Sequence, residues 1–261
     1  MRPVTARQVA AGGISWSLTD TGPDAAPALF LLHGNRDGKE MWQPLAEQLP
    51  ACRVIAVDLP GHGGTALPAG GSMADHVAAL GDLLTAVELP APAVVVGHSV
   101  GGQLAIGLAA AAPSQVGRLV VIDSALRHTS SFKPPAAASN EDMIGHAAPF
   151  FFPATVNPPP RREAAKRQVL ASWAAIPWTH HQRLGALARI DVPAAASLVK
   201  APTLLIYGEQ DRVCSFDPHG IELGHAIADC RHVIIENAGH FTYLEYPELV
   251  AAAIRDFIAA T

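Results

Sequence analysis

The stretch AVVVGHSVGGQLAIGLAAAAP, from Ala93 to Pro113, changes character in its middle. It begins as a continuous apolar run, breaks at GHSVGG, and continues as a helical pattern of small residues. A strand, a sharp turn and a helix in this order hold Ser99 on a strained backbone, where neighbouring side chains would collide. Gly97, Gly101 and Gly102 remove those collisions. The pattern predicts a serine at the carboxyl end of a strand, where α/β sheets bind ligands. A serine that merely caps the helix is the alternative.

Compact apolar runs alternate with helical patterns along much of the chain. Runs rich in Val, Ile and Leu indicate strands that are buried on both faces of a sheet. We therefore expect an α/β fold with a mostly parallel, doubly wound sheet of about eight strands. The expected strands are Ile14–Leu18 (antiparallel, at the edge), Ala28–Leu32, Arg53–Val57, Val94–Val96, Leu119–Ile122, Thr203–Tyr207 and His232–Ile235. The expected helices are Met41–Leu49, Met73–Val87, Ser99–Ala111, Ile221–Ala228 and Pro247–Ala259.

The alternation stops after Ile122 and resumes near Lys200. The interval contains clustered prolines, the aromatic run Phe150–Phe152, and helical patterns at Arg161–Ala174 and His181–Leu187. A structureless loop of this length is uncommon in a compact domain. We therefore expect a helical cap over residues 126–195, inserted into a core made of residues 1–125 and 196–261.

A serine nucleophile needs a base, and the base needs an acid that orients it. His240 lies in a glycine-bearing loop after the last expected strand, and Asp211 lies in the loop after the Thr203–Tyr207 strand. The order Ser99, Asp211, His240 is the order expected for a sheet of this kind. Asp123, at the end of the Leu119–Ile122 strand, competes for the role of the acid, and Glu209 is expected to support the loop.

An oxyanion would rest on two backbone N–H groups. Val100 supplies one at the start of the helix, and Asn35, after the Ala28–Leu32 strand, supplies the other. The candidates for contact with substrate are His33, Gly34, Trp42, His98, Phe151 and Trp173. A structural role is the alternative for His33, and a core position is the alternative for Trp42 and for the cap aromatics.

Five motifs in order resemble the α/β-hydrolase superfamily: LHGN at 32–35, VDLPGHGGT at 57–65, GHSVGG at 97–102, GEQD at 208–211 and NAGH at 237–240. The resemblance implies Ser99 as nucleophile, His240 as base, Asp211 as acid, and Asn35 and Val100 as oxyanion donors. It implies a cofactor-independent serine hydrolase of a small ester or related acyl compound. Carbon–carbon bond hydrolysis, lactone hydrolysis, elimination and perhydrolysis are alternatives on the same triad. A slowly turning-over ligand receptor is an alternative of another class.

The composition of the chain limits the kinds of partner that the protein is expected to bind. The chain has 18 Lys and Arg against 23 Asp and Glu, without the basic clustering typical of nucleic-acid binding. No apolar run reaches the length of a membrane span, and no HExxH-type metal spacing occurs. Three cysteines without CxxC spacing, and an N-terminus without a signal-peptide core, favour the cytoplasm. We expect a small-molecule substrate, no nucleic-acid or membrane partner, no cofactor, no metal, and a monomer or homodimer.

Overall fold

The computed structural model describes residues 5–21, 27–68, 71–89, 92–127, 139–155, 157–176 and 192–260. Within these ranges, eight strands form one sheet in the order β1-β2-β4-β3-β5-β6-β7-β8. From β4 to β8 all neighbouring strands are parallel, whereas β1–β2 and β2–β4 pair antiparallel. The strands are β1 (Thr5–Ala11), β2 (Ile14–Asp20), β3 (Ala28–Leu32), β4 (Arg53–Val57), β5 (Ala93–His98), β6 (Val116–Ile122), β7 (Thr203–Gly208) and β8 (Cys230–Ile235). The predicted fold class is confirmed.

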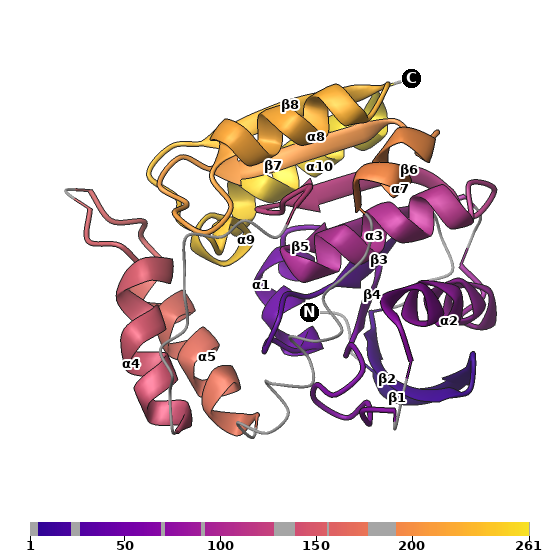
Figure 1. The fold of residues 1–261 in the computed structure, drawn as a ribbon, viewed down its shortest axis with the longest axis horizontal. Coiled ribbons are helices and arrows are strands. Elements are labelled where there is room, and N and C mark those ends of the chain that lie inside the picture. The colour runs from indigo at the N-terminus through magenta and orange to yellow at the C-terminus, as the bar shows by residue number, and fades with distance from the viewer. Residues whose placement is uncertain are drawn as a thin grey trace.

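Helices cover both faces of the sheet, as Figure 1 shows. Alternate strand residues explain this: Phe30 and Leu32 belong to one apolar cluster, and Leu29 and Leu31 to the other. The first face carries α2 (Met73–Ala86), α3 (Val100–Ala111), α7 (Val192–Leu198) and α8 (Ile221–Ala226), the last preceded by the π-helical turn η2 (Phe216–Gly220). The second carries η1 (Lys39–Trp42), α1 (Gln43–Glu47), α9 (Thr242–Glu245) and α10 (Pro247–Ala259). Among the described residues, no helix has both the length and the apolar character needed to cross a bilayer.

The carboxyl ends of the central strands are joined to one another by backbone hydrogen bonds. Ser99, directly after β5, donates to the carbonyl of Ile122 in β6 at 3.0 Å. Asp123, directly after β6, donates to Ile206 in β7 at 2.9 Å. The loops that follow β5, β6 and β7 therefore start side by side at one edge of the sheet.

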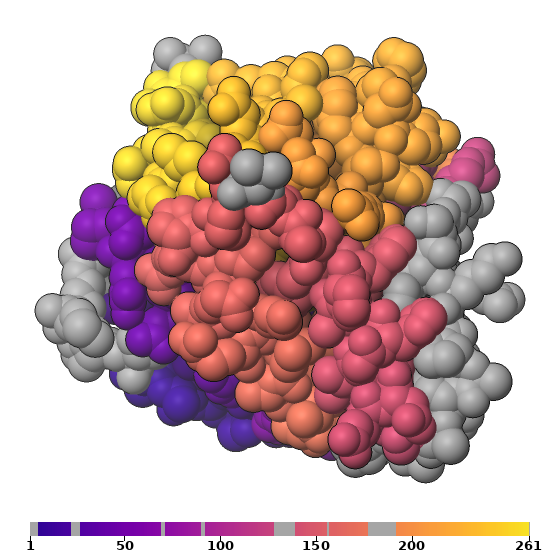
Figure 2. Space-filling view, turned by 90° about the vertical axis from the view of Figure 1, so that its left-hand side faces the viewer, coloured from indigo at the N-terminus to yellow at the C-terminus, as the bar shows by residue number. Residues whose placement is uncertain are grey.

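Two further helices, α4 (Asn140–Phe151) and α5 (Arg162–Ala175), lie between β6 and α7 in the sequence. They form a separate pair beside the sheet (Figure 1), and their surface fills the centre of the face in Figure 2. The α5 bounds match the predicted helix at 161–174 closely, whereas α4 was not expected as a helix. The predicted helix at 181–187 lies outside the described residues. Helix α7, across the predicted boundary at 195, packs in the core with α3.

Two predictions about individual elements, the edge strand and the helix at 41–49, are wrong. β1, not β2, is the edge strand on this side of the sheet, because Gly12 and Gly13 adopt positive φ and turn the chain into a hairpin. β1 is mostly exposed, so it has no apolar run by which it could be recognised. The expected helix at 41–49 is a 3-10 turn followed by the short helix α1, which begins next to Pro44.

We predict that Gly101→Ala destabilises the protein. A Cβ built on Gly101 would lie 2.2 Å from the carbonyl oxygen of Leu32, a backbone atom that cannot rotate away. Overpacking of this kind costs about 1–3 kcal/mol, to be measured as the free energy of unfolding in urea. Gly145→Ala is the matched control, because that exposed position in α4 has nothing within 4 Å of the added Cβ. Equal stability of the two variants would contradict this account.

Candidate active site

Ser99 occupies the turn between β5 and α3 with φ 53° and ψ −118°. A serine rarely adopts positive φ, and strained residues of this kind gather at functional sites. The turn is held from both sides, because the Ser99 N–H donates to Ile122 and the Ser124 hydroxyl donates to the Ser99 carbonyl at 2.6 Å. The side chain of Ser99 remains partly exposed.

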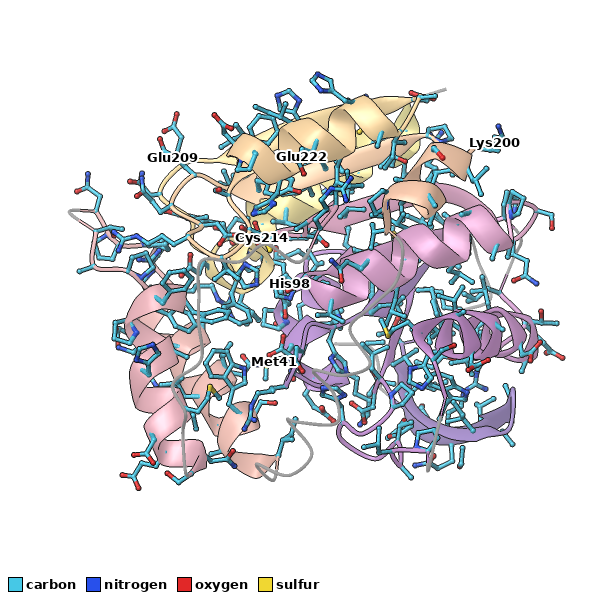
Figure 3. All side chains as sticks on the ribbon, viewed as in Figure 1. Met41, His98, Lys200, Glu209, Cys214 and Glu222 are labelled. Atoms are coloured by element: carbon cyan, nitrogen blue, oxygen red, sulfur yellow. The ribbon has the colours of Figure 1, made fainter. Side chains whose placement is uncertain are left out.

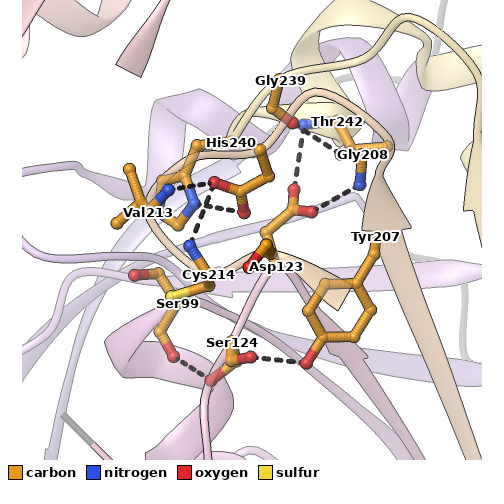
Figure 4. A network of polar contacts seen from close by, with 12 residues as sticks. Ser99, Asp123, Ser124, Tyr207, Gly208, Val213, Cys214, Gly239, His240 and Thr242 are labelled. Atoms are coloured by element: carbon orange, nitrogen blue, oxygen red, sulfur yellow. Dashed lines mark hydrogen bonds and ion pairs between the residues drawn. The ribbon is translucent and has the colours of Figure 1, made fainter. Parts of the chain in front are cut away.

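His240 lies next to this turn (Figure 4), where it meets Asp211. His240 Nδ1 lies 2.9 Å from Asp211 Oδ2, and both residues are buried. The other carboxylate oxygen, Asp211 Oδ1, accepts the N–H groups of Val213 at 2.7 Å and Cys214 at 3.1 Å. These two bonds hold the carboxylate of Asp211 so that Oδ2 can accept a hydrogen bond from the ring of His240. Within the described residues, no hydrogen bond joins Ser99 Oγ to His240, and such bonds are often loose before substrate binds.

The charge of Asp211 sets the protonation of His240. Burial alone would lower the pKa of His240, but the Asp211 charge and hydrogen bond outweigh burial and raise that pKa above 6.5. The raised pKa favours an imidazolium, which is the form that a base takes after it accepts a proton.

Asp123 is directed toward the backbone instead of toward His240. Its Oδ1 accepts the N–H of Gly208 at 2.9 Å, and its Oδ2 accepts the N–H of Thr242 at 3.1 Å (Figure 4). Burial and the neighbouring charge of Asp211 raise the pKa of Asp123 well above its usual range. Asp123 thus clamps together the loops that carry Asp211 and His240. Glu209 supports the same region, since its carboxylate accepts the N–H of Asn237 at 3.0 Å.

The first turn of α3 packs directly against the loop after β3. A Cβ on Gly101 would lie within 2.4 Å of the carbonyl oxygens of both Leu32 and His33, so only glycine permits this approach. The contact brings the start of α3, where Val100 lies, against the segment that leads to Asn35. Among the described residues, neither N–H has a hydrogen-bond acceptor. The two predicted oxyanion donors therefore come from adjoining segments.

Three of the candidates for substrate contact are fully buried. His33 accepts the N–H of Leu59 at Nε2 and lies 2.7 Å from the Gly34 carbonyl at Nδ1, which is the structural role considered above. Trp42 packs on Tyr243 with ring centroids 4.3 Å apart, and it lines a cavity of about 480 Å³ that none of Ser99, Asp211 and His240 borders. His98 lies beneath the site, near the middle of the view in Figure 3.

Of the two candidates between β6 and α7, Phe151 contacts His240, and Trp173 packs behind Phe151. The Phe151 ring lies edge-on to His240 with centroids 5.2 Å apart, and Trp173 lies edge-on to Phe151 at 4.9 Å. Phe151 also packs against an apolar cluster formed by Ala125, Val213 and Cys214.

Two buried arginines attach the α4–α5 pair to the loops of the site. Arg162 of α5 binds Glu245 of α9, with Nε to Oε1 at 2.8 Å and Nη2 to Oε2 at 3.2 Å. Glu245 also accepts the N–H of Gly239, the residue before His240, at 2.6 Å.

At the other end of α5, Arg36 donates through Nη2 to the carbonyls of Trp173 and Ile176 and to Asn140 Oδ1. Sequence reasoning missed both arginines. The sequence held only a weak signal for them. Arg36 could be noticed only because it directly follows Asn35, and Arg162 looks like any charged residue on a solvent-exposed helix. Within the described residues, no group of three or more His, Cys, Asp or Glu side chains is arranged to hold a metal ion.

Comparisons with known proteins agree with this geometry. A family model described as "Alpha/beta hydrolase family" matches residues 29–253. A pimeloyl-[acyl-carrier protein] methyl ester esterase of Neisseria meningitidis serogroup B is 30% identical over 250 residues, covering 90% of this chain and 94% of the relative. A human monoacylglycerol lipase is 28% identical over 91% of this chain and 77% of its own.

Among solved structures, the enol-lactonase from Burkholderia xenovorans LB400 superimposes with a TM-score of 0.85 at 22% identity, covering 97% of this chain and 99% of the other. That likeness concerns the fold. The family match spans most of the sequence, and the first of the relatives reaches 30% identity over nearly its whole length. The chain therefore belongs to the α/β hydrolase family and is a hydrolase.

Proposed function

We propose that the protein is a cofactor-independent serine hydrolase that cleaves a small, mostly apolar carboxylic ester or related acyl compound. The observation that carries this proposal is the 2.9 Å contact between His240 Nδ1 and Asp211 Oδ2, beside a serine held at positive φ. A histidine that binds an acid through Nδ1 presents Nε2 to a nucleophile in the tautomer that can accept a proton.

In the proposed mechanism, Ser99 Oγ attacks the ester carbonyl carbon while His240 Nε2 takes the hydroxyl proton. The tetrahedral oxyanion rests on the N–H groups of Asn35 and Val100. The carbon–oxygen bond to the alcohol then breaks, and His240 returns its proton to the leaving alkoxide. Water, deprotonated by His240, then attacks the carbonyl carbon of the acyl-enzyme. When the bond to Ser99 Oγ breaks, His240 returns that proton to Oγ, which releases the carboxylic acid and restores the serine hydroxyl.

Apolar walls support a compact substrate. Phe151 faces His240, and it packs with Val213, Cys214 and Ala125 beside the loop that holds Asp211. The α4–α5 pair, attached by Arg36 and Arg162, would form the helical cap that excludes water from this space. The names of two relatives, a methyl ester esterase and a monoacylglycerol lipase, place ester cleavage among the family's reactions. Contacts of substrate with His33, Gly34, Trp42, His98 and Trp173 remain predictions, as does a cytoplasmic location.

We predict that Asp211→Asn lowers kcat far more than Asp123→Asn does. Loss of the acid leaves His240 in the wrong tautomer and costs about 10⁴-fold in rate. Asp123→Asn weakens a clamp between loops, and we expect a loss of about tenfold, equivalent to ~1.4 kcal/mol. The reverse ranking would assign the acid to Asp123.

The pH dependence of kcat/KM provides an independent readout of the same pair. Only neutral His240 accepts the serine proton, so kcat/KM should rise as pH increases through the pKa of His240. Because Asp211 raises that pKa, we expect the midpoint of the profile to lie above 6.5. In Asp211→Asn the residual activity should show a lower midpoint. If wild type and Asp211→Asn have the same midpoint, Asp211 does not raise the pKa of His240 and is not its acid partner.

We predict that soluble esters with short acyl or aryl groups are cleaved faster than emulsified long-chain triglycerides. A series of p-nitrophenyl esters of increasing acyl length, together with lactones and a vinylogous diketone, measures this preference. Ser99→Ala should abolish turnover, and Ser197→Ala, an exposed serine on α7, is the matched control. Efficient cleavage of triglyceride emulsions with little activity on short esters would refute the substrate class. Cleavage of the diketone alone would change the reaction to carbon–carbon hydrolysis.

A further inference from the structure

A second acid–histidine pair lies under the site. Asp37 Oδ2 and His98 Nδ1 are 3.7 Å apart, and each side chain is 1% exposed. A Cβ built on Gly34 would lie 2.8 Å from both atoms, so the pair sits directly beneath the loop that carries Asn35. His98 is the last residue of β5 and immediately precedes Ser99. The pair therefore contacts both the oxyanion loop and the turn of the nucleophile.

The hydrogen bond at the other nitrogen fixes the tautomer of His98. Nε2 lies 2.8 Å from the main-chain carbonyl oxygen of His240. A carbonyl oxygen can only accept, so Nε2 must carry a proton. In a neutral imidazole the remaining nitrogen, Nδ1, is then a bare lone pair. This lone pair faces the Asp37 carboxyl group.

Two facing lone pairs would repel, and Asp37 has little else to stabilise a charge. Neither of its oxygens has a hydrogen-bond partner among the described residues, and no Lys or Arg side chain there forms an ion pair with it. An ionised carboxylate buried in this way is costly. One proton, carried by either Asp37 Oδ2 or His98 Nδ1, removes both the repulsion and the uncompensated charge across this 3.7 Å contact.

We propose that Asp37 and His98 share one proton, so that together they form a neutral pair that positions His240 through its main-chain carbonyl. The proposal rests on the assigned role of His240 as the base. The pair is neutral whether the proton resides on Oδ2 or on Nδ1. Because the pair is neutral, no net charge of Asp37 acts on His240, and Asp211 has the largest part in raising the pKa of the base, with a smaller part from Asp123.

Several other titratable groups surround the pair. The His240 ring lies 4.9 Å from the His98 ring, and Tyr243 of α9 lies at the same distance. His33, directly after β3, and His62 both interact electrostatically with Asp37, and Asp58 and Glu40 also act on His33. Burial and the neighbouring His240 ring lower the pKa of His98, whereas Asp37 and the main-chain carbonyl of His240 oppose this, and the net direction is downward.

The proton count can be measured on the protein without any substrate. With ¹⁵N-labelled histidine, NMR should show a His98 ring whose nitrogen shifts stay constant between about pH 5.5 and 9, assigned by comparison with His98→Gln. A His98 ring that gains a full proton across this range would overturn the shared proton. This readout stands even if the protein cleaves none of the esters tested.

Kinetics test the link to His240. In Asp37→Asn, the amide N–H can donate to the bare Nδ1, so the midpoint of the kcat/KM profile should match that of wild type. A midpoint displaced to lower pH would mean that Asp37 had acted as an unshared negative charge, and it would refute the proposal. Asp256→Asn, which removes an exposed carboxylate on α10, is the matched control.

His98→Phe retains a ring but loses the donor to the His240 carbonyl. We expect kcat to fall about 10–100-fold with little change in KM, and His98→Gln, whose amide N–H can replace Nε2, to recover part of the loss. Thermal melts establish that each variant folds. Unchanged kcat in folded His98→Phe would exclude a positioning role for His98.

Discussion

The left-handed turn at Ser99 is the constraint on which the rest of the site depends. It forces α3 to begin against the end of β3, where only glycine at position 101 allows the backbones to approach. That approach brings the start of α3, where Val100 lies, against the segment that leads to Asn35, and it leaves the serine side chain partly exposed. The turn is strained, and it persists because β6 holds it through the hydrogen bonds of Ile122 and Ser124.

Around this turn, buried polar groups connect the loops to one another. Asp123 joins the loop after β7 to the start of α9, and Glu245 joins the residue before His240 to Arg162 of α5. Removing one partner of the buried Arg162–Glu245 ion pair would leave a charge without a partner, which typically costs about 3–5 kcal/mol. Helix α5 is therefore coupled through Glu245 to the residue before His240, and a shift of α5 would disturb the position of His240.

The sequence allowed the fold and the three principal site residues to be predicted because each follows a strand within a short local pattern. Ser99 has its glycines, and His240 and Asp211 have loops after apolar runs. The choice between Asp211 and Asp123 could not be made locally, since both follow strands and only the contact with His240 distinguishes them. Pairs such as Arg162–Glu245 and Asp37–His98 join distant segments without any local pattern, and the exposed edge strand β1 lacks an apolar signal.

The central claim is that Ser99 is the nucleophile of an acyl-transfer reaction. Covalent labelling with a fluorophosphonate tests it most directly, followed by digestion and mass spectrometry of the modified peptide. The account predicts a single adduct per chain, on the peptide that contains Ser99, with loss of activity in proportion to labelling and no adduct in Ser99→Ala. An adduct on another residue, together with normal turnover by Ser99→Ala, would contradict it.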